Sequence, residues 1–305
     1  MNLVNSLRKR LPGSRWGVIG VPYFWLLLFF AIPFLIVLRI SFSSIERGKM
    51  PPYTDVLTQS ADSTWQLTLS LKNYVALFTD TLYAHAYISS LWIAGISTLL
   101  CLLIGYPMAY VIAKLPPSSR NVAMMMVVLP SWTSFLLRVY AWIGILKNNG
   151  LLNNLLMKLG LISEPLQILY TPIAAYIGIV YCYLPYMILP LYTNLVKHDG
   201  RLLEAAYDLG ASPLKAFFTI TLPQSKAGII AGCMLVMIPA VGEYVIPEML
   251  GGSDTLMIGR QLVNDFNITD WPRASAVAIA MLALLLVPIL IFNKVQQKEI
   301  EGRLT

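Results

Sequence analysis

Two carboxylates, Glu243 and Glu248, interrupt one of the long apolar stretches of this sequence. A charged side chain inside a membrane-spanning segment is costly and by default marks a functional site. An acid at that depth can replace the water around a cation in transit, and aromatic faces can do the same through cation–π contacts. The aromatic candidates are Trp132, Tyr140 and Tyr244. These residue types predict a path for a small cation.

A structural role competes with this one. Arg138 lies inside another apolar run and could pair with Glu243 or Glu248, which would hold two helices together without any contact to a substrate. Glu248 also lies nearer the outer end of its span than Glu243. For the aromatic residues, the competing roles are helix packing and an interfacial belt. Both roles of Glu243 stay open at this point.

The elements that must position these residues are membrane helices. Of 305 residues, 57% are hydrophobic and only 12% are charged, which excludes a soluble enzyme, a disordered chain and a nucleic-acid binder. A spanning helix needs about 20 apolar residues. We therefore predict an all-α polytopic membrane protein with six spans. They are expected at about 17–42, 86–113, 121–146, 170–196, 227–250 and 274–293.

Lys and Arg residues set the expected orientation. Thirteen of them fall on the side of the N-terminus and seven on the opposite side, so both termini are predicted to be cytoplasmic. The domains follow: an N-terminal segment 1–16, a transmembrane domain 17–293 and a C-terminal tail 294–305. The outer segment 43–85 is expected to hold a short helix. Residues 197–226 form a long cytoplasmic loop, which we call the coupling loop.

Local signals in the coupling loop predict two short helices joined at a glycine corner. Asp199 can cap the first helix, and Gly210 stands where a C-terminal cap belongs. Ser212 and Pro213 read as the N-cap and first residue of the second helix. Pro223 is expected to end that helix before the fifth span. In that span, Gly228 and Gly232 form a GxxxG face suited to close helix packing.

Seven residues of this loop stand at a fixed spacing: Glu204, Ala205, Ala206, Gly210, Ile220, Leu222 and Pro223. They match in full the EAA signature of ABC-importer permeases, and the chain resembles that family from about Leu71 onward. The resemblance implies a type I importer (MetI-like) permease fold, in which the loop docks on an ATPase subunit. It further implies that the two alanines let the helix lie deep in a groove. Glu204 would hold the loop's own geometry or pair with the partner.

The same resemblance implies a transport subunit and not an enzyme. The sequence lacks a G-x-x-x-x-G-K-[ST] motif, so ATP and Mg²⁺ are expected on a separate ATPase. Three cysteines without metal-ligand spacing predict no metal and no cofactor in this chain. The implied partners are a second permease forming a heterodimer, two ATPases, a periplasmic binding protein and the bilayer of a bacterial inner membrane.

Longer runs resemble the polyamine branch of the family, which implies a small cationic substrate. They include 129–134, 138–142, 183–192 and 242–252. The run that contains Glu243 looks nearest to the putrescine permeases of that branch. A permease for spermidine or another small solute is the first alternative. An ATP-independent secondary transporter or channel that uses Glu243 is an alternative of another class, and a membrane scaffold without flux is a third.

Overall fold

The computed structural model describes residues 13–59, 65–253 and 255–301 of the chain. Residues 1–12 of the predicted N-terminal segment and 302–305 of the predicted tail lie outside the described residues. The chain divides into two compact units, one comprising the residues up to Thr79 together with Asp265–Ala280. The other comprises Asp80–Asn264 together with the residues from Met281 onward.

The first unit begins with a membrane span that runs over Ile19–Ser41. It consists of α2 (Gly13–Leu26), the π-helical turn η1 (Leu27–Ala31) and α3 (Ile32–Ser41). The apolar side chains of this span are not buried within this chain, and Val21, Phe24 and Leu35 are each more than half exposed. Its bounds agree with the prediction of 17–42.

The outer segment of this unit holds one expected element and one unexpected element. The short helix predicted there is α4 (Lys72–Thr79). Before it, β1 (Leu57–Gln59) and β2 (Trp65–Leu67) form a small antiparallel hairpin in which Leu57 is opposite Leu67. No alternation in the sequence had indicated these strands. The fold is helical apart from this hairpin in the part of the chain that the structure describes.

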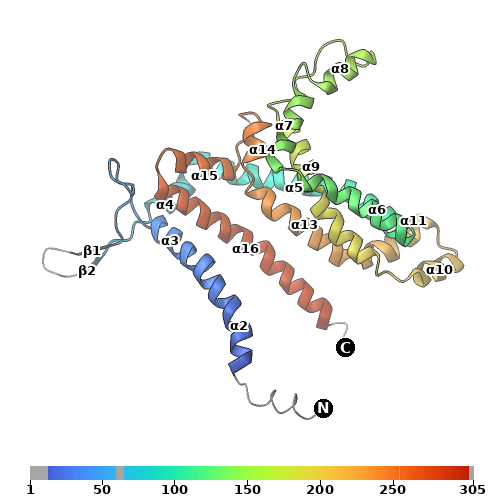
Figure 1. Cartoon of the computed structure of the whole chain (residues 1–305), viewed down its shortest axis with the longest axis horizontal. Helices are drawn as coiled ribbons and strands as arrows, with labels where there is room; N and C mark the ends of the chain where they lie inside the picture. The colour runs from blue at the N-terminus through green and yellow to red at the C-terminus, as the bar shows by residue number, and fades with distance from the viewer. Residues whose placement is uncertain (1–12, 60–64, 254, 302–305) are drawn as a thin grey trace. The chain divides into compact units, whose positions relative to one another are not determined.

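Three spans form the centre of the second unit: α5 (Thr81–Lys114), α9 (Pro172–Leu195) and α13 (Lys226–Val241). They pack against one another in pairs (Figure 1). The predicted GxxxG face lies in this packing. A Cβ atom added at Gly228 would stand 2.8 Å from Asn194 Cβ, and one at Gly232 would stand 2.7 Å from Met187 Sδ. Small residues on α13 therefore allow its backbone to approach α9 closely.

Two predicted spans are broken helices. The third consists of α6 (Pro117–Val128), the 3-10 turn η2 (Leu129–Trp132), α7 (Phe135–Leu146) and α8 (Leu151–Lys158), and it bends by 89° after η2. The fifth bends by 64° between Gln224 and Lys226. The described residues contain four unbroken helices long and apolar enough to span a membrane, or up to six spans if each bent pair counts as one. The prediction of six spans holds in that sense, and the third of them is bent.

Three helices complete the chain: α14 (Val245–Met249), α15 (Ile258–Asn267) and α16 (Trp271–Glu301). The second span begins at Thr81, earlier than the predicted residue 86, because Asp80 accepts the N–H of Leu82 at 3.0 Å and caps the helix there. The last helix continues past residue 293 as far as Glu301. The predicted tail therefore begins inside a helix.

Candidate coupling loop and membrane carboxylates

The coupling loop folds as two short helices. The first, α10 (Gly200–Asp208), starts at Asp199, whose carboxylate accepts the backbone N–H of Arg201 at 3.0 Å. The second begins with α11 (Pro213–Ala216), and the Ser212 hydroxyl accepts the N–H of Lys215 at 3.4 Å. Both predicted N-caps are confirmed. Each satisfies a backbone donor that has no partner inside its helix.

Gly210 forms the corner between the two helices. Its φ is +79°, in the left-handed region that glycine enters at little cost. The N–H of Ala211 bonds the carbonyl of Ala206 at 2.9 Å, and the N–H of Gly210 bonds the carbonyl of Tyr207 at 2.9 Å. This pair of bonds is a Schellman motif. The predicted C-terminal cap is therefore confirmed, and it fixes the direction in which the chain leaves α10.

Pro223 does not end the second helix, contrary to the prediction. The chain passes from α11 through the π-helical turn η3 (Phe217–Thr221) into α12 (Leu222–Gln224), and it bends only after that. A proline lacks an N–H and crowds the preceding turn, and the wider π-helical turn before it accommodates both. The bend falls at Ser225, whose hydroxyl lies 2.9 Å from the Tyr106 hydroxyl of α5.

An apolar surface covers the outside of the coupling loop. Leu209 is 89% exposed and Leu214 is 73% exposed, and Leu202 and Phe218 are exposed as well. Glu204 is exposed and forms no hydrogen bond or ion pair with any described residue. Its carboxylate therefore does not hold the geometry of the loop. Of the two expected roles of Glu204, only pairing with a partner protein remains. Exposed leucines beside an unpaired charge suit docking to another protein.

Glu243 lies past the end of α13, in the gap before α14, and not inside a spanning helix as predicted. Its Oε1 accepts the backbone N–H groups of Tyr244, Val245 and Ile246 at 3.2, 3.0 and 3.4 Å. Its Oε2 accepts the hydroxyl of Tyr183 at 2.6 Å. The side chain is only 8% exposed. The carboxylate thus caps the start of α14 and ties it to α9.

The two other membrane charges have separate surroundings. Glu248 of α14 forms an ion pair with Arg260 of α15. Arg138 forms no ion pair with an acid in the described ranges, and its guanidinium carbon lies 5.7 Å from the ring centroid of Phe135. The sequence had left open a pairing of Arg138 with Glu243 or Glu248. The structure gives both acids other partners.

The predicted aromatic residues do not gather around Glu243. Trp132 ends η2, Tyr140 lies in α7, and both are exposed; neither bonds the Glu243 carboxylate within the described chain. Tyr244 contacts that carboxylate through its backbone N–H. Sequence reasoning missed Tyr183, which contributes the shortest of the bonds. Nothing in the spacing links Tyr183 to an acid 60 residues further along the chain.

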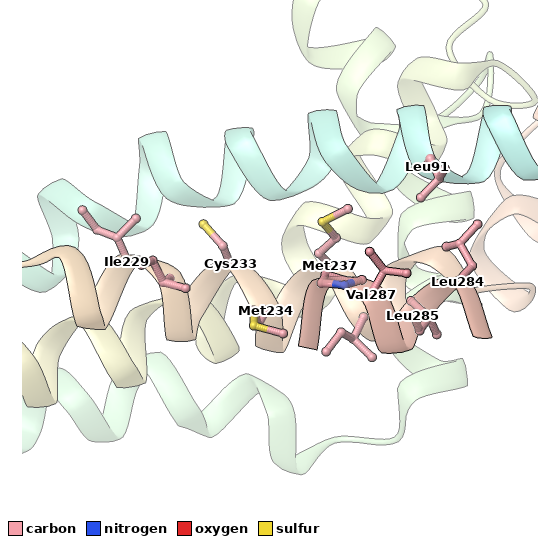
Figure 2. Close-up of a pocket in the computed structure, with 11 residues that line it drawn as sticks. Leu91, Ile229, Cys233, Met234, Met237, Leu284, Leu285 and Val287 are labelled. Atoms are coloured by element: carbon pink, nitrogen blue, oxygen red, sulfur yellow. The ribbon is translucent and has the colours of Figure 1, made fainter. Parts of the chain in front are cut away.

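A cavity of about 480 Å³ lies beside α13 in the second unit. Figure 2 shows residues that line its wall: Cys233 and Met237 on α13, Leu91 on α5 and Leu284 on α16. Every residue in this wall is apolar. Since a buried cation needs an acid, a hydrogen-bond acceptor or an aromatic face, this cavity does not suit a small cation.

The paired helices of the coupling loop and the helical spans define a membrane transport permease. Residues 102–301 match the family model described as "Binding-protein-dependent transport system inner membrane component". The chain belongs to this family. It is accordingly a transport component of the inner membrane and not an enzyme.

Among curated relatives, the chain is similar to the "Spermidine/putrescine transport system permease protein PotB" of Haemophilus influenzae. The two are 40% identical over 305 residues, which covers 99% of each chain. Identity to PotB of Escherichia coli is 38% over 281 residues, or 91% of this chain and 97% of the relative. The likeness to the putrescine permease PotH that the sequence predicted stays a prediction.

Solved structures share the fold. A bacterial ABC transporter that imports alginate contains a chain that matches with a TM-score of 0.67 at 18% identity, covering 96% of this chain and 99% of that one. The MetNI methionine transporter matches with a TM-score of 0.52 at 14% identity, covering 71% and 95%. These likenesses confirm the predicted importer permease fold.

Proposed function

We propose that this chain is a permease subunit of an ABC importer for polyamines. The observation that carries the proposal is the full-length similarity to spermidine/putrescine permeases, with 99% of both chains covered. The buried Glu243 carboxylate just past the end of α13 adds chemical support, because a polyamine carries positive charge through the bilayer core. Within this class, putrescine is the more specific proposal, and it rests on the residue run around Glu243.

The proposed assembly has a second permease, two ATPases and a periplasmic binding protein, with both termini of this chain in the cytoplasm. ATP and Mg²⁺ belong to the ATPases. The coupling loop docks on one of them through Glu204, Ala205, Ala206, Gly210, Ile220, Leu222 and Pro223. Its exposed leucines and its unpaired Glu204 supply the contact, and the Schellman corner holds α10 in position.

For the substrate path we propose Glu243 first, with Tyr244, Glu248, Trp132 and Tyr140 along the route. Each carboxylate oxygen has two lone pairs, and Oε2 of Glu243 accepts one bond, from Tyr183. That oxygen can accept a second donor, such as an ammonium group, when the site opens. The competing role is structural, since the same carboxylate caps α14.

An uptake experiment tests this proposal. Cells that lack the chain and any redundant importer receive wild type, Glu204→Lys or Glu243→Gln, and uptake of labelled putrescine and spermidine is measured. Asp208→Lys is the matched control for Glu204→Lys, because both acids are exposed on α10. We expect wild type and Asp208→Lys to restore uptake and Glu204→Lys to fail, with all variants present in the membrane.

Several outcomes would contradict the proposal. Unchanged uptake of both polyamines in cells without the chain would refute the substrate class and leave the permease fold intact. Equal failure of Glu204→Lys and Asp208→Lys would remove the specific role of Glu204. For Glu243→Gln, a raised KM with normal stability favours the substrate path, whereas lowered thermal stability favours the structural role.

A further inference from the structure

A cavity of about 250 Å³ with charged and polar side chains in its wall lies behind α10, at the ends of the spans that point toward the coupling loop. Its wall comes from the last turn of α5, the first turn of α6, the junction between α9 and α10, and the end of η3. The chemically important residues in this wall are Lys114, Arg120, His198, Asp199 and Thr221. None of them belongs to the EAA signature or to the proposed substrate path.

Two buried polar groups in the wall of this cavity have no hydrogen-bond partner among the described residues. Arg120 donates through Nη2 to the carbonyls of Ala113 and Leu115 at 2.9 and 3.0 Å, which holds its guanidinium in place, while its buried Nε has no hydrogen-bond partner among the described residues. Thr221 is only 3% exposed, and its hydroxyl likewise lacks a described partner. A buried donor without an acceptor is costly, so each such group calls for a ligand or water.

Charge in the cavity favours an anion. Lys114 Nζ lies 4.2 Å above the Tyr110 ring, and neither Lys114 nor Arg120 pairs with an acid in the described part of the chain. The acid in the wall is Asp199, whose Oδ1 is committed to the cap of α10. The Nε2 atom of His198 lies 3.2 Å from Asn194 Oδ1. Two positive charges therefore share the cavity wall with one carboxylate that already caps α10.

We propose that this cavity binds a phosphate group through Arg120, Lys114 and Thr221. Phosphate oxygens accept several charge-assisted hydrogen bonds at once, which matches a guanidinium, an ammonium and a hydroxyl that line one cavity. The phosphate group can come from an anionic phospholipid. Both α5 and α9 end at this cavity, and basic pockets between the ends of membrane spans bind lipid headgroups. Free phosphate has the same chemistry.

A ligand at this site would join three parts of the molecule. Lys114 belongs to α5, Arg120 to α6, and Thr221 is the last residue of η3 in the coupling loop. A phosphate group held by all three ties the loop to the ends of two spans. The occupant would therefore fix the position of α10, which the proposed function assigns to the contact with the ATPase.

The test is a binding measurement on the full chain purified in detergent. Dioctanoyl phosphatidylglycerol and inorganic phosphate are titrated separately, with dioctanoyl glycerol as the lipid that lacks phosphate, and binding is followed by native mass spectrometry and calorimetry. Lys114→Gln and Thr221→Val each remove one contact and should weaken binding roughly tenfold. Lys197→Gln is the matched control, because Lys197 is exposed nearby but does not line the cavity.

The outcomes separate the possibilities. Binding of phosphatidylglycerol alone supports a headgroup site, and binding of inorganic phosphate as well supports a site for the free anion. Lys114→Arg keeps the charge and should retain most of the affinity. Binding of neither probe would overturn the proposal. Equal weakening by Lys114→Gln and Lys197→Gln would also overturn it, since that result indicates diffuse surface charge. The Tm of each variant is measured as well. If Thr221→Val is unstable, the affinity of Lys114→Gln alone tests the proposal.

Discussion

Replacing Gly210 by alanine tests the geometry of the coupling loop in isolation from its packing. No heavy atom lies within 4 Å of the position that an added Cβ would take, so the methyl group has room. The cost comes from the backbone, because φ is +79° and an L-residue pays about 1–2 kcal/mol there. A change of that size raises the population of the open corner about 5–30-fold.

Hydrogen exchange measures this population directly. The amide of Ala211, which bonds the carbonyl of Ala206, should exchange faster in Gly210→Ala by that factor. Gly200→Ala is the matched control, since Gly200 also has open space around it but has no positive φ and begins α10. We expect Gly200→Ala to exchange like wild type. Unchanged protection of Ala211 in Gly210→Ala, or equal loss in both variants, would refute the view that a left-handed cap holds the corner.

Three further changes have defined expected results. Tyr183→Phe removes the hydroxyl that bonds the buried Glu243 carboxylate just past the end of α13, and it should lower the free energy of unfolding by about 1–3 kcal/mol. Tyr186→Phe is the control, because the Tyr186 hydroxyl bonds no described residue, and it should cost little. Equal effects of the two changes on thermal unfolding would contradict this expectation. Gly178→Ala places a Cβ 2.6 Å from Leu250 Cδ1 and should lower the free energy of unfolding by about 1–3 kcal/mol. Gly95→Ala is the control, because an added Cβ there has open space. An unchanged stability of Gly178→Ala would contradict the close contact between Gly178 and Leu250. Burial lowers the pKa of His198 below its usual 6.5 in the folded chain, so folding favours the neutral imidazole. The stability of the fold is therefore lost as pH falls below 6.5 toward the lowered pKa, and His198→Gln should lessen this loss. An identical dependence of Tm on pH in wild type and His198→Gln would refute this expectation.

The coupling loop could be predicted from the sequence because its signals are local. Asp199 and Ser212 cap the helices that follow them, and Gly210 supplies a backbone conformation that few other residues adopt. Each of these caps depends on residues within five positions along the chain. Pro223 was misread because a π-helical turn before it relieves the clash that normally ends a helix.

The surroundings of the membrane carboxylate could not be predicted in the same way. The length of an apolar run predicts that a helix can span the membrane, but it does not show where the helix ends. We therefore predicted Glu243 inside the fifth span, whereas α13 ends at Val241, before Glu243. Its bond to Tyr183 joins α9 to the start of α14, and it depends on how two spans pack. Contacts of this kind have no signature in the spacing of residues.

The short length of α13 connects these two regions. Its 16 residues lie between the bend at Ser225 and the capped break at Glu243, and a 16-residue helix has little freedom to absorb a displacement at one end. Gly228 and Gly232 allow the backbone of α13 to lie close against α9. The two helices must therefore move together, or this close contact between them must break. We therefore expect a shift of the coupling loop to reach the Glu243 carboxylate through α13. That carboxylate bonds α9 as well as α14, so the same shift must either carry α14 along or break the bond from Tyr183, which would free the acid to meet a cation.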